Sequence, residues 1–228
     1  MIHPLSFAAL LLLSAAPALA ADRSFPVGGF DKIRLSGSTD VEVSTGKQVS
    51  VRATGDQVDL DRLDISVSGG ELVIAEKRGN WSMGWNSNSA KVFVTVPGLV
   101  AASLPGSGNL RIDRVKGPAF DGLLNGSGDL ILADMASDVV RFTLKGSGDI
   151  SSAGTCGSAT LELHGSGNIS AGNLRCRTVS ATLKGSGDIS AFATKSADLV
   201  LQGSGDIALR GGAVCTKTAR GSGDISCS

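Results

Sequence analysis

The chain is poor in the side chains that most often carry chemistry or net charge. Its 228 residues include no tyrosine, two histidines and 4% aromatic residues. The 21 Lys and Arg residues balance 21 Asp and Glu residues, so no overall field attracts nucleic acid or an anionic membrane surface. His164 is the single histidine beyond the N-terminal segment, which leaves too few ligands for a zinc site of the usual His and Cys spacing. We therefore expect no nucleic-acid partner, no metal and no other cofactor.

The N-terminal segment predicts export. Residues 5–19 are apolar or small, too few to span a bilayer, and they lead into Ala18-Leu19-Ala20, the small-x-small pattern that signal peptidase accepts. No later stretch reaches the roughly 18 apolar residues that a membrane helix needs. We interpret residues 1–20 as a signal peptide and residues 21–228 as an exported chain without a membrane span, located in the periplasm or secreted to the cell surface.

A repeated Gly-Ser-Gly turn dominates the rest of the sequence. Each copy continues with Asn or Asp and then Leu or Ile, and an apolar residue stands two positions before each first glycine. Between the turns, apolar and polar residues alternate as in a strand, for example in Leu161-Glu162-Leu163. A period of 18 to 20 residues is typical of a solenoid. The copies begin at residues 106, 126, 146, 165, 185, 203 and 221.

These features predict an all-β fold, a single-stranded parallel β-helix with 18–20-residue coils. Equivalent Leu and Ile residues would stack about 4.8 Å apart as core ladders, and both glycines of each turn would adopt positive φ. The general rule for parallel crossovers predicts a right-handed coil. We expect one domain over residues 21–228, with regular repeats over 101–228 and longer, irregular coils over 21–100.

The irregular part contains an imperfect copy of the turn at residues 35–41 (LSGSTDV), where threonine replaces the second glycine. The residues between this turn and the one at residue 106 suffice for about three longer coils. Residues 77–90 are polar, hold both tryptophans and predict a protruding loop. Strands are expected at residues 49–53, 63–67, 72–74 and 92–96.

A family resemblance rests on three parts of the sequence. They are the opening FDKIRLSGSTDVEV, the middle segment KVFVTVPGL and the run of GSGD[IL] turns. Together they resemble the head GIN domain family of bacterial exported proteins, which are described as autotransporter adhesins. The resemblance spans roughly residues 30–228. It implies a β-helix, an exported location and an adhesion or surface-binding role, and it implies no catalytic residues.

The Asp or Asn after each turn forms a predicted column of polar side chains. Such a column could bind cations, but calcium-binding β-rolls repeat a nonapeptide, about half of this period. We favour turn capping, in which each side chain accepts hydrogen bonds from N–H groups of its turn. Cations before three turns, Lys145, Lys184 and Arg220, would compensate the stacked charge. The column comprises Asn109, Asp129, Asp149, Asn168, Asp188, Asp206 and Asp224.

Four cysteines suit an oxidising, exported compartment. Cys156 and Cys176 are one coil apart, so they should stack on neighbouring turns, and Cys215 with Cys227 would then secure the last coil. The absence of a CxxC motif argues against a redox role. We predict structural disulfides.

The remaining chemistry favours binding. Seven similar turn serines indicate structure and not a nucleophile, and we predict no catalytic residue. Trp81 and Trp85, with Asn86 and Asn88 beside them, are the best binding candidates, because aromatic faces on a polar loop suit a sugar ring or a protein partner. They could equally fold back over a helix end.

We therefore predict a non-enzymatic adhesin or surface- and glycan-binding module with an extracytoplasmic glycan or protein as its partner. The alternatives are a polysaccharide-acting β-helix enzyme and a purely structural envelope protein. Exposed coil ends could also pair with a second copy of the chain, since unpaired strand edges invite pairing.

Overall fold

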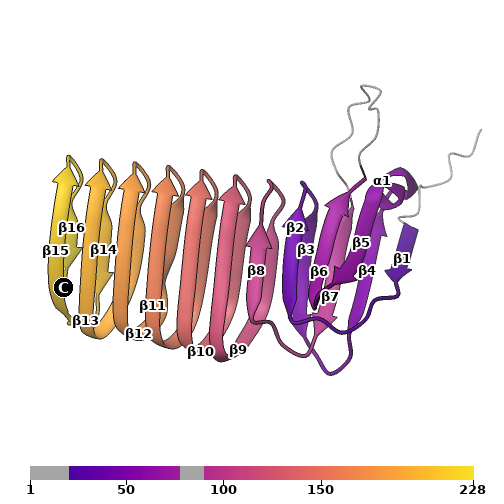
Figure 1. The fold of residues 1–228 in the computed structure, drawn as a ribbon, viewed down its shortest axis with the longest axis horizontal. Coiled ribbons are helices and arrows are strands. Elements are labelled where there is room, and N and C mark those ends of the chain that lie inside the picture. The colour runs from indigo at the N-terminus through magenta and orange to yellow at the C-terminus, as the bar shows by residue number, and fades with distance from the viewer. Residues whose placement is uncertain (1–20, 78–89) are drawn as a thin grey trace, which may run out of the picture.

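The computed structural model describes residues 21–77 and 90–228, which form one 16-stranded sheet wound into a β-solenoid (Figure 1). The predicted signal peptide, residues 1–20, lies outside the described residues. No helix among those described has the length and apolarity to cross a membrane. The elements are β1 (Ala21–Phe25), β2 (Lys32–Ser36), β3 (Asp40–Thr45), β4 (Ser50–Gly55), α1 (Gln57–Arg62), β5 (Leu63–Ser68), β6 (Glu71–Glu76), β7 (Lys91–Val96), β8 (Ala101–Leu104), β9 (Leu110–Gly126), β10 (Asp129–Gly146), β11 (Asp149–Gly165), β12 (Asn168–Gly185), β13 (Ile189–Gly203), β14 (Ile207–Arg210), β15 (Val214–Gly221) and β16 (Ile225–Cys227).

The predicted parallel β-helix is confirmed. Strands β9 to β13 pair in parallel and in chain order, and β14, β15 and β16 complete the stack. The register places equivalent residues of successive coils side by side, so that Leu144 lies between Leu124 and Leu163. The solenoid has about six turns. Its handedness stays a prediction.

The core consists of the apolar ladders that the repeat predicts. The Leu residues before the turns and the Ile or Leu residues after them are essentially inaccessible to solvent. Each such side chain contributes about 1.5–3 kcal/mol by leaving water. One ladder contains Leu104, Leu124, Leu144, Leu163, Leu183 and Leu201, and the other contains Leu110, Leu130, Ile150, Ile169, Ile189 and Ile207.

The two glycines of a turn are required for different reasons. Gly165, the first glycine of its turn, has φ of +146°, a conformation that a residue with a Cβ rarely adopts. Gly167, the second glycine, has no such φ, but a Cβ there would overlap the carbonyl oxygen of Gly148 in the preceding coil. The expectation of positive φ at both glycines is therefore wrong for the second glycine of each turn, and among the first glycines it is wrong for Gly106 and Gly126. The second glycine is needed because successive turns stack backbone on backbone.

The N-terminal region contains fewer coils than the sequence suggested. The turn at Gly37 packs directly on the turn at Gly106, where the Ser107 N–H donates to the Gly37 carbonyl over 3.0 Å. Strands β2 and β3 thus form the coil next to β8 and β9. Strands β6 and β7 form one further coil beyond them. The residues between the two turns therefore form a coil on the far side of β2 and β3, and the chain then returns to pair with β2 and β3 through β8 and β9. No coil lies between the turns at Gly37 and Gly106.

Antiparallel strands take up the residues expected to form additional coils. β4 pairs antiparallel with β7, β1 pairs antiparallel with β4, and β5 forms a hairpin with β6. Gly69 and Gly70 connect the hairpin with φ of +58° and +76°, the backbone of a two-residue turn with positive φ at both positions. This pairing explains why the region departs from longer coils: the Gly-Gly turn reverses the chain within the sheet.

The two ends of the solenoid are closed by charged side chains. At the N-terminal end the Glu76 Oε1 accepts the Ser38 N–H at 3.1 Å, in place of the glycine carbonyl that serves each later turn. At the C-terminal end Lys217 occupies the position in register with buried Leu199, and its Nζ donates to the Ile225 carbonyl at 3.2 Å. Glu76 thus replaces the acceptor that a further turn would supply, and Lys217 ends the row that contains Leu199.

Both predicted disulfides are confirmed. Cys156 and Cys176 are bonded between neighbouring coils with a Cα–Cα distance of 4.5 Å, and their positions are directly in register. Cys215 and Cys227 are bonded across the last coil with a Cα–Cα distance of 6.7 Å. No described cysteine is free.

Candidate functional site

The polar column beside the turns connects successive coils. The Oδ1 of each Asp or Asn accepts the backbone N–H of the equivalent residue in the next coil, and not N–H groups of its own turn as expected. For example, the Asp149 Oδ1 accepts the Asn168 N–H at 2.8 Å. The N···O distances are 2.8–3.3 Å. With the residue that donates its backbone N–H named first, the pairs are Asn109–Asp40, Asp129–Asn109, Asp149–Asp129, Asn168–Asp149, Asp188–Asn168, Asp206–Asp188 and Asp224–Asp206.

A groove of about 500 Å³ follows part of this column. Its lining alternates side chains of the column with hydroxyls such as Ser170 and Ser190. One oxygen of each carboxylate or amide in the groove is engaged by a backbone N–H. Residues 21–77 and 90–228 contain no group of three or more side chains arranged to hold a metal ion. These contacts favour a structural role for the column.

Charge compensation across the turns differs from the expectation. Among the described residues, no ion pair joins Lys145, Lys184 or Arg220 to a carboxylate. The ion pairs on the regular coils link neighbouring coils instead. They are Arg114–Asp134 at 3.3 Å and Arg141–Asp121 at 3.4 Å. The turn cations do not stand next to one another, because His164 separates Lys145 from Lys184 and Gln202 separates Lys184 from Arg220.

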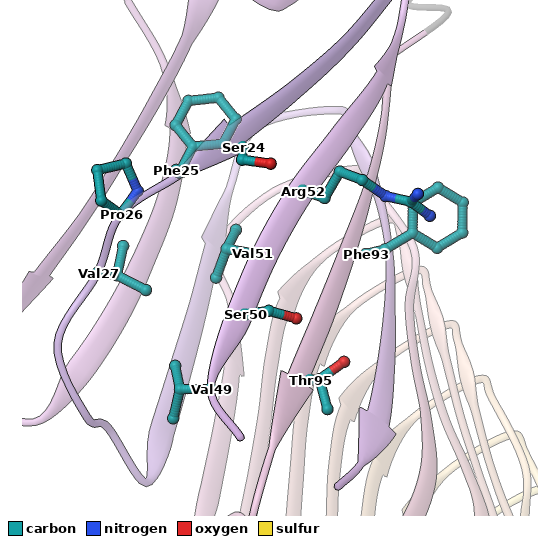
Figure 2. Close-up of a pocket in the computed structure, with 10 residues that line it drawn as sticks. All are labelled: Ser24, Phe25, Pro26, Val27, Val49, Ser50, Val51, Arg52, Phe93 and Thr95. Atoms are coloured by element: carbon teal, nitrogen blue, oxygen red, sulfur yellow. The ribbon is translucent and has the colours of Figure 1, made fainter. Parts of the chain in front are cut away.

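The structure reveals a second depression, at the N-terminal end, that the sequence interpretation missed. Its volume is about 550 Å³, and it lies on β1, β4 and β7 (Figure 2). Aromatic and aliphatic side chains contribute one part of its wall, and three hydroxyl groups and a guanidinium contribute the other. The lining residues are Ser24, Phe25, Pro26, Val27, Val49, Ser50, Val51, Arg52, Phe93 and Thr95.

Phe93 is the centre of a charged cluster beside this depression. Its neighbours in β7, Val92 and Val94, are buried in the core, so the alternation of the strand places Phe93 on the outer face. The Arg52 guanidinium lies 5.3 Å from the ring centroid, and Figure 2 shows the two side chains together. The Lys91 ammonium lies 5.7 Å from the same centroid. Contacts of this kind are worth about 0.5–1 kcal/mol at an exposed site.

The predicted aromatic binding residues cannot be placed. Trp81, Trp85, Asn86 and Asn88 lie outside the described residues. The segment that holds them connects β6 to β7 and therefore enters the strand that carries Phe93. The signal for Phe93 itself was present in the sequence, because an aromatic residue stands at the polar position of the alternating segment VFVTV.

A salt bridge fixes the helix at this end of the molecule. The Arg23 Nη1 donates to the Leu60 carbonyl at 2.8 Å, and its Nη2 pairs with the Asp61 carboxylate. The hydrogen bond from Arg23 lowers the pKa of Asp61 below its usual value of 3.8, with a smaller contribution from Gln57. These contacts hold α1 against β1, the edge strand that supplies Ser24 and Phe25 to the depression.

The stacked coils, the buried Leu and Ile ladders and the two disulfides define a disulfide-linked β-solenoid protein. The chain belongs to the family described as "Putative auto-transporter adhesin, head GIN domain", whose model matches residues 29–213. This confirms the resemblance seen in the sequence. Family membership and disulfides together point to an exported protein.

Solved structures show the same fold over nearly their full lengths. A putative adhesin from Bacteroides fragilis has a TM-score of 0.85 and 24% identity, covering 92% of this chain and 97% of that chain. A putative lipid binding protein from Parabacteroides distasonis has a TM-score of 0.70 and 27% identity, covering 93% and 98%. A putative adhesin from Parabacteroides merdae has a TM-score of 0.70 and 16% identity, covering 93% and 97%. No curated protein gives a significant sequence match.

Proposed function

We propose that this protein is a non-enzymatic adhesin that acts outside the cytoplasm and binds a glycan or a protein through its N-terminal end. The depression with Phe93 at its edge carries the proposal, because it combines an outward aromatic ring with cations and hydroxyl groups. Aromatic and Arg side chains at a surface are the groups that most often anchor a partner. The family name and the adhesins of the same fold support this reading.

The regular coils supply a scaffold for such a site. Their backbone groups pair from coil to coil, and the disulfide between Cys156 and Cys176 joins two coils in the middle of the stack. A binding site on such a sheet already has a fixed backbone, so binding of a partner costs little conformational entropy. The polysaccharide-acting enzyme considered from the sequence would need a carboxylate pair made distinct from its neighbours, whereas the turn carboxylates repeat one hydrogen-bonding role.

The role of the tryptophans is supported by the sequence and not by the structure. We propose that Trp81 and Trp85, with Asn86 and Asn88, extend the binding surface beyond β7. Their segment joins β6 to β7, the strand that carries Lys91 and Phe93.

Binding of the purified chain to a panel of immobilised oligosaccharides and extracellular-matrix proteins tests the proposal. We expect the Trp81→Ala/Trp85→Ala double variant to bind at least about tenfold more weakly, since stacked aromatic anchors are typical hot spots. Val214→Ala is the matched control, because Val214 is a 78% exposed apolar residue at the opposite end of the solenoid. Unchanged binding by the double variant would remove the tryptophans from the site. New reducing ends released from any oligosaccharide would overturn the non-enzymatic assignment.

A further inference from the structure

We propose that the depression on β1, β4 and β7 binds an acidic sugar residue, whose carboxylate is held by Arg52. This inference rests on the proposed binding function and adds the chemical class of the ligand. It depends on three features of described residues: an uncompensated cation, a set of hydroxyl groups and a wall that is only partly apolar.

The charges around Phe93 leave the Arg52 guanidinium without an ion pair among the described residues. The Lys91 ammonium forms an ion pair with Glu42 over 2.6 Å. In the sheet register Glu42 lies between Arg111 and Phe93, and Lys91 lies opposite Asp40. Arg52 lies beyond Phe93 in the same row and has no ion pair among the described residues.

The cation–π contact gives this free guanidinium a defined position. The Phe93 ring supports it from one side at 5.3 Å, which leaves the N–H groups at the edge of its plane available. A guanidinium presents these groups as a fork that matches the two oxygens of a carboxylate. Arg52 is therefore suited to an anion with two oxygens in one plane.

The remaining lining favours a sugar over an acyl chain. Ser24, Ser50 and Thr95 contribute hydroxyls to the same depression, and sugar hydroxyls can form hydrogen bonds with them. An acyl chain would cover these groups without replacing their bonds to water, which costs free energy. Phe25 and Pro26 supply apolar surface for the C–H face of a ring. The volume of about 550 Å³ falls within the range of roughly 300–1,000 Å³ found for small-molecule sites.

Calorimetric titration of the full chain with trigalacturonate and with neutral galactotriose tests the inference. We expect trigalacturonate to bind about tenfold more tightly and its affinity to fall with added salt. Arg52→Gln should remove this preference, and Arg52→Lys should keep part of it because the charge remains while the fork is lost. The control is Arg141→Gln, which removes an exposed arginine from the regular coils and should leave both affinities unchanged.

Three results would overturn the acidic-sugar inference. They are equal affinity for the two trisaccharides, unchanged trigalacturonate binding by a folded Arg52→Gln variant, and binding of dodecanoate in place of the sugar. If the chain binds other members of the oligosaccharide and protein panel but not trigalacturonate, the inference fails while the adhesin proposal stands. If it binds nothing in the panel, the adhesin proposal fails. Thermal unfolding monitored by circular dichroism establishes that each variant is folded.

Discussion

Residues 110–228 repeat one coil, whereas residues 21–104 extend the same core but interrupt the coil with antiparallel strands. In the repeated part, most surface residues lie beside the equivalent position of the next coil, so side chains form columns along the solenoid. An arginine also lies over an aromatic ring in the repeated part, Arg175 over Phe192 at 5.2 Å, but in the N-terminal part antiparallel pairing places Arg52 and Phe93 together in the lining of a depression. Repetition thus produces one kind of surface along the coils, and departure from it produces a different surface, with a depression, at the N-terminal end.

The two regions also end differently. Every internal turn has a glycine carbonyl from the preceding coil as its acceptor, whereas the first turn uses Glu76. The last coil replaces a core leucine by Lys217. A lysine at a terminal core position would lose hydration if a second copy stacked on this end, which disfavours end-to-end pairing. Pairing of two copies through the coil ends stays a prediction that light scattering can test.

Substitution of a turn glycine should have the largest effect. In Gly167→Ala the new methyl group would overlap the Gly148 backbone, and neither backbone can move without disturbing the turns on both sides. We expect a loss of about 4 kcal/mol in the free energy of unfolding, or failure to fold. Gly117→Ala is the matched control, since a Cβ there meets nothing within 4 Å. Equal denaturant midpoints for the two variants would show that the close contact between successive turns does not require glycine at residue 167.

Removal of the terminal disulfide should have the next largest effect. The Cys215→Ser/Cys227→Ser variant is expected to lose about 2–3 kcal/mol, because the closed loop no longer restricts the unfolded chain. The last coil is exposed over most of β15, so the loss should be local. Hydrogen exchange should therefore accelerate in β15 and β16 and stay unchanged in β10. Uniform acceleration across the solenoid would contradict the distinction between a fraying end and a stable middle.

The repeated half could be predicted because one rule applies to every coil. The spacing of the turns and of residues such as Leu144 determines register, core and the stacking of Cys156 on Cys176. The role of the second glycine was less accessible, because it depends on contact between turns and not on the local backbone. Likewise, the Asp149 side chain could bond either its own turn or the next coil, and only the stacked structure distinguishes the two.

The N-terminal half was harder because its strands pair in two directions. The segment Ser68-Gly69-Gly70-Glu71 carries a hairpin signal, but alternation alone does not say whether a strand pairs parallel or antiparallel. The depression depends on which strands meet, since Arg52 and Phe93 are distant in sequence and adjacent only through the β4–β7 pairing. Sequence periodicity could place each residue on an outer face but could not bring the two together.

Loss of the Glu76 carboxylate should weaken the N-terminal end moderately. Glu76→Ala leaves the Ser38 N–H and the Ser38 and Thr39 hydroxyls without this acceptor, and we expect a loss of about 1–2 kcal/mol in thermal or denaturant unfolding. Glu76→Gln retains a carbonyl oxygen at the same place and should recover at least part of the loss. If Gln is no better than Ala, the carboxylate acts through its charge and not as a substitute for a glycine carbonyl.

The smallest effect should come from acid titration of Asp61. Because the Arg23 hydrogen bond lowers the pKa of this carboxyl below 3.8 in the folded chain, the pair stabilises the fold fully above pH 3.8, and the contribution disappears as the pH falls through the lowered value. Asp61→Asn should therefore lower the Tm slightly at pH values well above 3.8 and have no effect well below it.

The control is Asp64→Asn, because Asp64 is an exposed residue of β5 whose carboxylate has no ion pair among the described residues. The exposure of Asp61 keeps the difference small, since water and salt screen the pair. A Tm difference that persisted in strong acid would mean that Asp61 stabilises α1 by packing and not by its charge.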